Sequence, residues 1–426
     1  MLNNAPNADT ANLSPQISEY TPVEVVLRRV LAHANLEGKV ESVPAFQSYA
    51  RVLAADVVAP ADVPSSSTSH MDGYAVISDG LLNASASRPV VLRVVDAAGP
   101  GARSNRSLRG GETIQVATGA VLPWGADAVV PVESVDVRGK EIRVGTSVQP
   151  GEHVYRAGQD VRRGDLVLAR GHRIRSQDVG ILVSLGFRRI QVRKRPRVAV
   201  LATGSELTSA RRPKKGKTVE SHSLVFLRLA ESLGCTAVDM GIVRDDPKAL
   251  RASLTYAISK SDFVLTLGGT SAGKHDLVVD AVSSLEPEVL VHGLQLDRGR
   301  VTGVASVGSK PIMMLPGPIQ AAANAFLVAG VPIIAKLSGS RQTGISIPCV
   351  LGAPWVARKR FSDFEKVVYV KLSPGRQEVA EPIAGETESM KLLTSADGYF
   401  VVPKNVKRLE AGDPVDVRLV PGFSFA

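Results

Sequence analysis

The sequence predicts a multidomain α/β protein, in which a domain built on a mostly parallel sheet is flanked by β-rich domains. The first observation is that short apolar runs alternate with helical patterns from residue 197 onward. The second is that the runs on both sides of this region are short, valine-rich and separated by glycine and proline. The third is composition: 426 residues with 44% hydrophobic but 4% aromatic side chains leave packing to valine, alanine and leucine, which suits buried parallel strands.

The N-terminal segment, residues 1–14, is predicted to be a disordered tail because it is polar. It has neither the basic start nor the apolar centre of a signal peptide, so we expect a cytoplasmic protein. A capping box at 21–24, with Pro22 at the first helical position, then begins a helix that runs to about Asn35.

The region that follows is predicted to be β-rich. Together with the first helix it forms an N-terminal unit, 15–194, with a β domain inserted at about 60–160. A helix is expected near 176–185. Strands are expected at 90–95, 113–117, 128–132, 142–144 and 165–168.

Residues 195–338 carry the pattern of the α/β domain, and a small β domain, 345–426, closes the chain. The α/β strands are expected at 198–202, 237–243, 263–267, 289–296 and 312–315, and the helices at 223–233, 246–258, 277–284 and 319–337. In the last domain, strands are expected at 367–372, 399–403 and 416–419. Right-handed crossovers place the carboxyl ends of the parallel strands at one edge, where ligands bind.

Composition also restricts the class of partner. The most apolar stretch, 326–337, is short and interrupted by Gly330, Pro332 and Lys336, so we expect no membrane span. Cys235 and Cys349 lack the spacing of a metal site and are interpreted as core residues. A net charge of +10 indicates an anionic partner, either a phosphorylated small molecule or only solvent on a basic face. Nucleic acid is disfavoured because aromatic residues do not interleave with the basic runs.

The first candidate site is a glycine-rich turn directly after the strand at 263–267. It begins with Gly268 and Gly269 and ends at Asp276, where a helix starts. Such a turn presents backbone N–H groups to a phosphate, and a carboxylate at its end can hold a divalent cation. The simpler interpretation is a strand-to-helix turn with Asp276 as the N-cap.

Acidic residues follow three strands of the same domain. Glu206, Asp245 and Asp276 each lie where a strand has just ended. If the strands are neighbours, the three carboxylates converge on one edge and suit Mg²⁺ beside a phosphate. Taken singly, Asp245 could be only the neighbour of a helix cap, and Glu206 only a first-turn residue.

Two turns of the β region are also unusual. The segment 69–76 places Asp72 beside a glycine and an aromatic residue, and 117–123 places the Thr118 hydroxyl in a tight turn. Both could also be plain turns between strands, which is the commoner case for such sequences.

Seven motifs in order give the chain a resemblance to one family. They are SHMDGYAV (69–76), TGAVLPWGADAVVPVE (118–133), GQDVRRGDLVLARGHRI (158–174), RVAVLATGSEL (197–207), GIVRDDP (241–247), GGTSAGKHD (268–276) and LPG (315–317). The chain thereby resembles the molybdopterin molybdenumtransferases, the MoeA family, which includes the E domain of gephyrin. The resemblance implies an L-shaped homodimer of four-domain subunits with a molybdopterin-binding α/β domain.

The resemblance also implies an activity and its residues. Enzymes of the family hydrolyse adenylyl-molybdopterin with a divalent metal, expected to be Mg²⁺, and insert molybdate into the dithiolene. The substrate is thus an anionic pterin, and the adenylyltransferase of the same pathway is a further expected partner. By motif, the metal and catalytic residues are Glu206, Asp245 and Asp276, and the substrate-binding residues are Gly268, Gly269, Ser271, Asp72, Thr118, Asp160, Arg300, Pro316 and Ser389. Of these, Asp72, Thr118 and Asp160 are expected to face the α/β domain of the other subunit, whereas Arg300, Pro316 and Ser389 line the oxyanion side.

The chain departs from the family pattern where oxyanions are recognised. A family aspartate is replaced by Ser205, an asparagine by Ser223 and a lysine by Asp297, and the asparagine and proline of the Leu-Pro-Gly-Asn-Pro motif are Pro318 and Ile319. A carboxylate in place of an ammonium repels a tetrahedral dianion. Two alternatives to an active transferase are therefore a diverged paralogue, which binds a molybdopterin-like or nucleotide ligand without inserting metal, and a dimeric scaffold.

Overall fold

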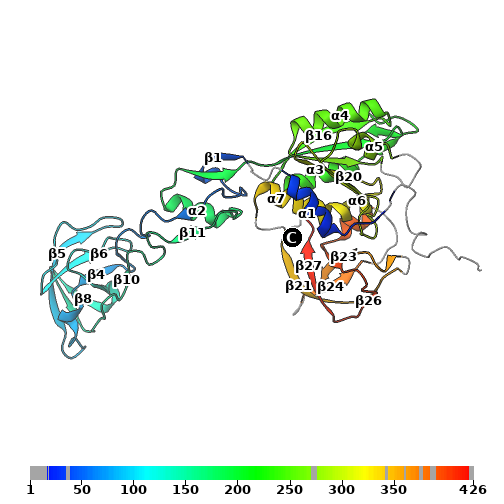
Figure 1. Ribbon diagram of the computed structural model, residues 1–426. Coiled ribbons are helices and arrows are strands. Elements are labelled where there is room, and N and C mark those ends of the chain that lie inside the picture. The colour runs from blue at the N-terminus through cyan, green and yellow to red at the C-terminus, as the bar shows by residue number, and fades with distance from the viewer. Residues whose placement is uncertain are drawn as a thin grey trace, which may run out of the picture.

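The computed structural model describes residues 17, 19–34, 39–269, 276–340, 344–358, 361–373, 378–383 and 390–421. The chain forms an elongated molecule with an α/β domain and a β barrel at one end and a long arm that ends in a second sheet (Figure 1). The sequence prediction of an α/β multidomain fold with β-rich parts on both sides is confirmed.

A six-stranded sheet forms the centre of the α/β domain. Four strands run parallel, as predicted, and two antiparallel strands extend the sheet at one edge. The strand order is β16 (Thr236–Val243), β13 (Arg197–Thr203), β17 (Phe263–Leu267), β20 (Lys310–Leu315), β19 (Gly303–Val307) and β18 (Val289–His292). Strand β19 was not predicted, and β18 ends at His292, before the expected 296.

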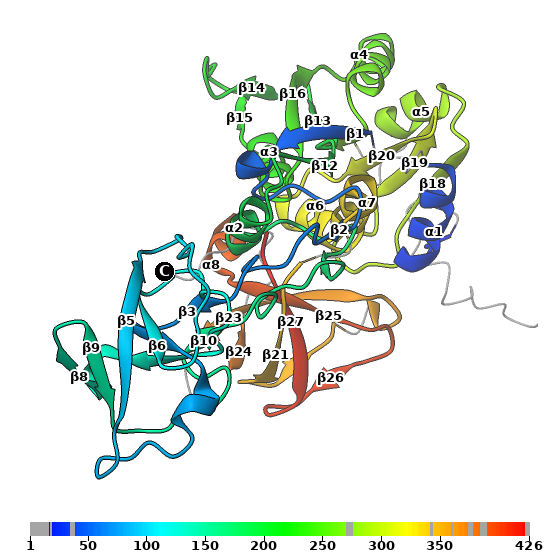
Figure 2. The same cartoon turned by 90° about the vertical axis from the view of Figure 1, so that its left-hand side faces the viewer.

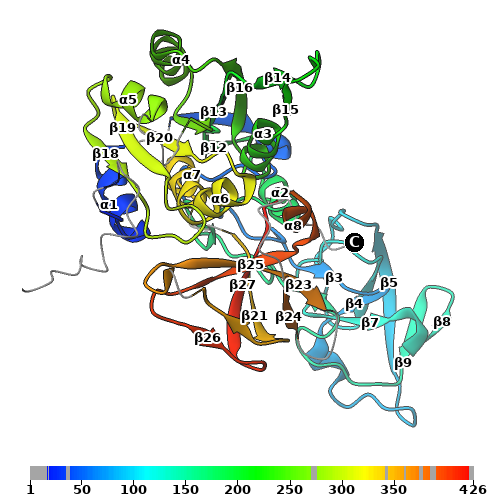
Figure 3. The ribbon, with the colours of Figure 1, turned by 90° about the vertical axis from the view of Figure 1, so that its right-hand side faces the viewer.

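Helices cover both faces of this sheet, so its central strands are buried on both sides. Along β13, Val198 and Val200 point into one apolar core, whereas Ala199 and Leu201 point into the other. The first core is covered by α3 (His222–Ser232) and α6 (Ile319–Ala325), and the second by α4 (Pro247–Lys260) and α5 (Leu277–Ser283). Figure 3 shows α4 and α5 on the outer side of the sheet.

The first helix, α1 (Val23–His33), packs on the α/β domain although it precedes the arm in sequence. Val26 and Val30 are fully buried in the core shared with β13. The predicted N-terminal unit 15–194 is therefore split in space, with its helix on the α/β domain and the remainder in the arm (Figure 1).

The apolar segment after β20 forms one continuous helix, Ile319–Ser338, as the expected 319–337 helix predicts. It consists of α6, a π-helical turn η5 (Phe326–Gly330) and α7 (Val331–Ser338). With 20 residues and a mean hydropathy of 1.6 it is long and apolar enough to cross a membrane by length and composition alone. The helix is 89% buried inside the molecule and forms part of its core.

The arm is a ribbon of paired outgoing and returning segments. Its pairs are β1 (Val40–Pro44) with β12 (Arg189–Arg193), β2 (Val57–Val58) with β11 (Leu166–Leu168), and β3 (Thr68–Ser69) with β10 (Val154–Tyr155). Helix α2 (Ser176–Ser184) packs beside β11, near the expected 176–185.

The arm ends in a second six-stranded sheet, seen nearest the viewer in Figure 2. Only β5 and β6 are parallel; the other neighbours are antiparallel. The order is β7 (Ala128–Pro131), β4 (Gly73–Val76), β6 (Glu112–Val116), β5 (Val90–Ala98), β9 (Glu141–Val144) and β8 (Val135–Arg138).

The C-terminal domain is a closed five-stranded barrel below the α/β domain (Figure 1). Its strands are β21 (Ser346–Leu351), β24 (Val379–Pro382), β23 (Lys366–Ser373), β25 (Gly398–Val402) and β27 (Pro414–Leu419). Outside the barrel lie the pair β22 (Trp355–Val356) and β26 (Arg408–Leu409) and the helix α8 (Met390–Ser395).

Candidate functional site

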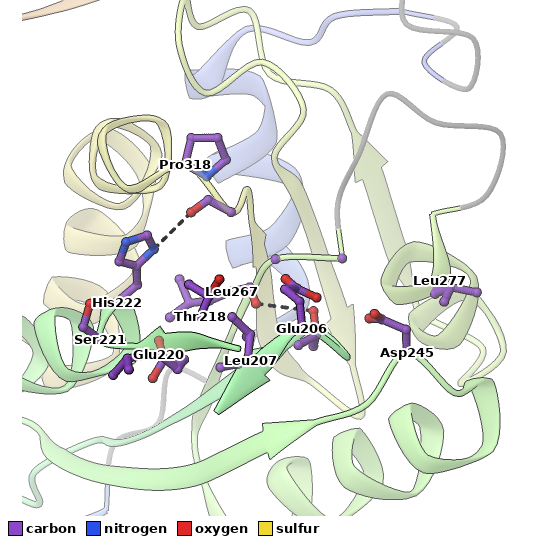
Figure 4. A pocket seen from close by; sticks show the side chains of 17 residues that line it. Glu206, Leu207, Thr218, Glu220, Ser221, His222, Asp245, Leu267, Leu277 and Pro318 are labelled. Atoms are coloured by element: carbon purple, nitrogen blue, oxygen red, sulfur yellow. Dashed lines mark hydrogen bonds between the residues drawn. The ribbon is translucent and has the colours of Figure 1, made fainter. Parts of the chain in front are cut away.

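A cavity of about 650 Å³ lies at the carboxyl ends of β13 and β17, the edge that the sequence predicts for a ligand (Figure 4). One side is formed by a small pair of parallel strands, β14 (Leu207–Ser209) and β15 (Thr218–Glu220), and another by the start of α3. The polar and glycine residues that line it are Thr203, Gly204, Glu206, Thr218, Glu220, Ser221, His222, Asp245, Gly268, Gly269 and Gly317.

The floor of the cavity is the start of the glycine-rich turn. Gly268 and Gly269 have φ angles of +83° and +69°, which residues with a side chain rarely adopt. A Cβ on Gly269 would lie 2.5 Å from Val278 Cγ2 and 2.7 Å from Thr203 Oγ1. A Cβ on Gly268 would lie 2.7 Å from the Thr203 carbonyl oxygen. Both positions therefore require glycine, and they leave backbone open to the cavity.

Two of the three predicted carboxylates meet in this cavity. Glu206 folds back over Gly204, whose hypothetical Cβ would lie 2.6 Å from Glu206 Oε1. Asp245 Oδ2 accepts a 2.8 Å hydrogen bond from the Ser205 backbone N–H, and the Asp245 N–H donates to Ser205 Oγ at 3.1 Å. Ser205, one of the departures from the family pattern, thus holds Asp245 in place.

The third carboxylate, Asp276, lies outside the cavity lining. Its side chain is 1% exposed, and its Oδ1 accepts from the Val279 N–H at 3.1 Å, as an N-cap of α5. Its Oδ2 lies 3.4 Å from His292 Nε2, and burial raises the pKa of the carboxyl. This is the simpler alternative that the sequence left open.

The prediction that three carboxylates surround one cation is not met by this arrangement. Among the described residues no group of three histidine, cysteine, aspartate or glutamate side chains could hold a metal ion. Glu206 and Asp245 remain as two oxygen donors beside the glycine turn. The side chains therefore do not fit the predicted magnesium site of three carboxylates.

Sequence reasoning missed two polar residues of the cavity, Glu220 and His222. The Glu220 carboxylate accepts from the backbone N–H and the hydroxyl of Ser223, and so caps α3. His222 Nδ1 lies 3.1 Å from the Gly317 carbonyl oxygen, in the turn after β20 (Figure 4). Ser223 itself is buried, so the side chain that this turn presents to the cavity is that of His222. The signal was its place at the start of the expected helix 223–233.

A second cavity, of about 390 Å³, lies between the α/β domain and the barrel and is lined by Asp297, Arg298 and Lys366. Burial raises the pKa of Asp297, against the opposing charges of Arg358, Arg300 and Lys366. Asp297 Oδ1 has no hydrogen-bond partner among the described residues.

The residues predicted for the oxyanion side do not line this second cavity. The Arg300 guanidinium lies 4.6 Å from the centre of the Phe361 ring, and Pro316 is buried. Neither is among the residues that line either cavity, so their predicted role is not supported by this geometry. Arg298, two residues before Arg300, lies there instead.

The predicted residues of the β region lie in the arm, away from the first cavity of the same chain (Figure 1). Asp72 Oδ1 accepts from the N–H and the hydroxyl of Thr118, at 2.6 and 2.8 Å, and these bonds lower its pKa. Asp160 is exposed in the ribbon, where its N–H donates to the Val63 carbonyl. Ser271 and Ser389 lie outside the described residues.

Comparison with known proteins then identifies the family. Three family models match in succession: the MoeA N-terminal region (domains I and II) at residues 21–186, a molybdopterin-binding domain at 199–336, and the MoeA C-terminal region (domain IV) at 349–420. A molybdopterin biosynthesis protein of Methanocaldococcus jannaschii is 30% identical over 406 residues, which cover 93% of this chain and 96% of the relative. The chain belongs to the MoeA family.

Other relatives agree with this assignment. Molybdopterin molybdenumtransferase 2 of Mycobacterium tuberculosis is 29% identical over 397 residues, 92% of this chain and 97% of that protein. The crystal structure of the MoeA protein of Pyrococcus horikoshii matches with a TM-score of 0.82 and 28% identity, and covers 95% of this chain and 100% of that structure. The resemblance drawn from the seven motifs is confirmed, and the chain is an enzyme of the molybdopterin molybdenumtransferase family.

Proposed function

We propose that this chain catalyses the last step of molybdenum cofactor assembly, in the cytoplasm and as a homodimer. In this reaction adenylyl-molybdopterin loses its adenylate by hydrolysis, and molybdate enters the dithiolene. Relatives named molybdopterin molybdenumtransferase, similar over most of the chain, support a role in molybdenum cofactor biosynthesis. The proposed hydrolysis and molybdate insertion depend on the first cavity.

The observation that carries the proposal is that Gly268, Gly269, Glu206 and Asp245 share one cavity. The Gly268 N–H donates to the Leu315 carbonyl at 3.0 Å, so of the two obligatory glycines it is the Gly269 N–H that we assign to a phosphate oxygen, where it stabilises charge that develops there. Glu206 and Asp245 present acceptor oxygens, which orient a water molecule for attack on the phosphoanhydride and accept its proton. Because the described side chains do not form the predicted magnesium site, no step is assigned to a metal.

The second cavity is proposed to hold the oxyanion. The Arg298 side chain supplies positive charge there, since it lines the cavity while one of its N–H groups donates to Gln320 Oε1 at 2.5 Å. Asp297 opposes anion binding when it is ionised, but burial favours its neutral form.

Turnover of adenylyl-molybdopterin tests the proposal. We expect the purified protein to release AMP and, with molybdate, to form cofactor, and Glu206→Gln to slow AMP release by about 100-fold because the acceptor loses its basicity. Glu141→Gln, at an exposed position of the outer sheet, is the matched control and should keep full activity. Equal rates for the two variants would reject the assigned role of Glu206.

The second candidate, a diverged binder that does not insert molybdate, is favoured by one observation, the buried Asp297 in the second cavity. Such a protein would release AMP, or retain the pterin, without forming cofactor. Asp297→Asn decides between the transferase and the diverged binder. If the transferase proposal holds, the parent chain should form cofactor. If the Asp297 carboxylate blocks the oxyanion, only the variant should form it.

A further inference from the structure

Among the described residues that line the cavity, His222, the first residue of α3, carries the one imidazole. It bridges two segments that are distant in sequence, because its Nδ1 lies 3.1 Å from the carbonyl oxygen of Gly317 (Figure 4). These are the two segments in which the chain lacks an expected asparagine, at Ser223 and at Pro318. A polar side chain is thus supplied by a residue that the family pattern did not indicate.

The hydrogen bond to Gly317 determines which nitrogen carries the proton. A carbonyl oxygen only accepts, so Nδ1 must be the donor. In the neutral ring Nε2 is then an acceptor, which cannot bond to the unprotonated oxygens of a phosphate. When the ring is protonated, Nε2 becomes a charged donor, the kind of group that binds phosphate strongly.

The other charged side chains that line the cavity are acidic among the described residues. Three carboxylates line it, those of Glu206, Glu220 and Asp245. The nearest cation on the adjoining loop is Lys217, whose Nζ donates to the Ser205 carbonyl at 2.7 Å. Glu220 is engaged by Ser223, so it is a fixed negative charge two residues from the imidazole. Among the described residues that line the cavity, His222 is therefore the side chain that can present a positive charge to a phosphate.

We propose that His222 is the residue of this chain that recognises the phosphate of its substrate, by taking up a proton as the phosphate binds. Nδ1 stays bonded to Gly317, and the protonated Nε2 donates to a phosphate oxygen. The inference rests on the proposed function for the identity of the substrate. It goes beyond that function by making affinity depend on pH through a named group.

Binding of inorganic pyrophosphate tests this without any turnover. Its affinity is measured by calorimetry from pH 5.5 to 8.5 for the parent chain and for His222→Asn, an amide that can still donate to Gly317 but cannot be charged. We expect the parent chain to bind about tenfold more tightly near pH 6, and the ratio to fall toward one near pH 8.5, because histidine loses its charge between these values. Because both proteins bind the same pyrophosphate, the ratio of their affinities cancels the change in protonation of pyrophosphate with pH.

Further variants keep the result interpretable. His222→Arg, a permanent cation, should bind tightly at both pH values, and His33→Asn, at an exposed position of α1, should match the parent chain. Calorimetry in buffers of different ionisation enthalpy should show more proton uptake for the parent chain than for His222→Asn. An affinity ratio of the parent chain to His222→Asn that does not change with pH, or equal proton uptake by the two proteins, would overturn the inference. If the ratio depends on pH but the protein releases no AMP, only the proposed function is overturned.

Discussion

Two glycine-containing turns of this molecule carry the same kinds of residue and lead to different outcomes. In the outer sheet, Asp72 and Thr118 flank a strand end and satisfy each other, since one carboxylate oxygen accepts both hydrogen bonds from Thr118. In the central sheet, Glu206 and Asp245 lie beside Gly268 and Gly269 around a cavity of about 650 Å³. Similar residue types thus make a closed turn in one region and an open site in the other.

Topology explains the difference. In a parallel sheet every strand ends at the same edge, so the segments after β13, β16 and β17 come together although they are far apart in sequence. In the mainly antiparallel outer sheet, neighbouring strands end at opposite edges and fewer turns meet. The lesson is that a polar turn becomes a candidate site through its neighbours in space.

The largest expected effect comes from a matched pair of glycine substitutions. Gly269→Ala forces a Cβ against Val278 and Thr203 at a φ of +69°, so we expect loss of activity by at least about 100-fold and destabilisation by roughly 2 kcal/mol or more. Gly119→Ala has a similar φ, +80°, but open space around the Cβ, and should cost only about 1 kcal/mol with activity retained. AMP release measures the activity of each variant, and thermal unfolding measures its stability. Equal losses of activity in the two variants would contradict the difference between the two turns.

The second prediction tests whether the outer turn completes a site on another copy of the chain. Asp72→Ala and Glu206→Gln should each be nearly inactive alone, but dimers that contain one copy of each should have about half of the parent rate. In such a dimer one of the two sites keeps both residues, and the other has lost both. Activity is measured per dimer after purification with two different tags.

The control for this experiment pairs two variants from the same cavity. Glu206→Gln with Asp245→Asn should restore nothing, because every site keeps one damaged carboxylate. No recovery with the Asp72→Ala pair would show that the outer turn serves no site in a partner, and recovery in both mixtures would show that the assay does not report on the site.

The smallest expected effect on turnover comes from a carboxylate between the two regions, Asp178 of α2. Burial raises its pKa, but hydrogen bonds from Arg175 and His172 outweigh this and lower it from 3.8 to about 2. Its contribution to stability, about 2 kcal/mol, is therefore complete above about pH 4 and lost as the pH falls toward 2.

Asp178→Asn should accordingly unfold more easily at pH 7 by about 2 kcal/mol, with a smaller difference near pH 3 and unchanged turnover per folded molecule. Denaturant unfolding at the two pH values measures this. A difference that grows on acidification would contradict the assigned ion pairs.

The fold could be predicted well because its signals are local. Alternating apolar runs gave β13, β16, β17 and β20 within about two residues of their bounds. Strand β19 was missed because it is antiparallel to its neighbours, outside the strand-helix alternation, and begins at Gly303, which is typical of a turn. The α6 to α7 helix was predicted to within one residue, and a π-helical turn before Pro332 lets it continue past the proline.

The site was harder to predict because it depends on where side chains point. Glu206, Asp245 and the two glycines followed from their positions after strands, and the structure brings them together. Asp276 has the same position after a strand, but the backbone N–H of Val279 turns its carboxylate into the helix. The only sequence signal of His222 was its place at the start of an expected helix, since its partner Gly317 lies 95 positions away in sequence.

The way in which the arm is attached has a mechanical consequence. Its outgoing and returning strands leave the α/β domain side by side as the antiparallel pair β1 and β12, and Arg173 of the arm donates to the Leu233 carbonyl at 2.8 Å. A small bend at this attachment would displace the whole outer sheet, at whose ribbon end the turn of Asp72 and Thr118 lies. Any surface that binds the outer sheet therefore controls the angle of the whole arm.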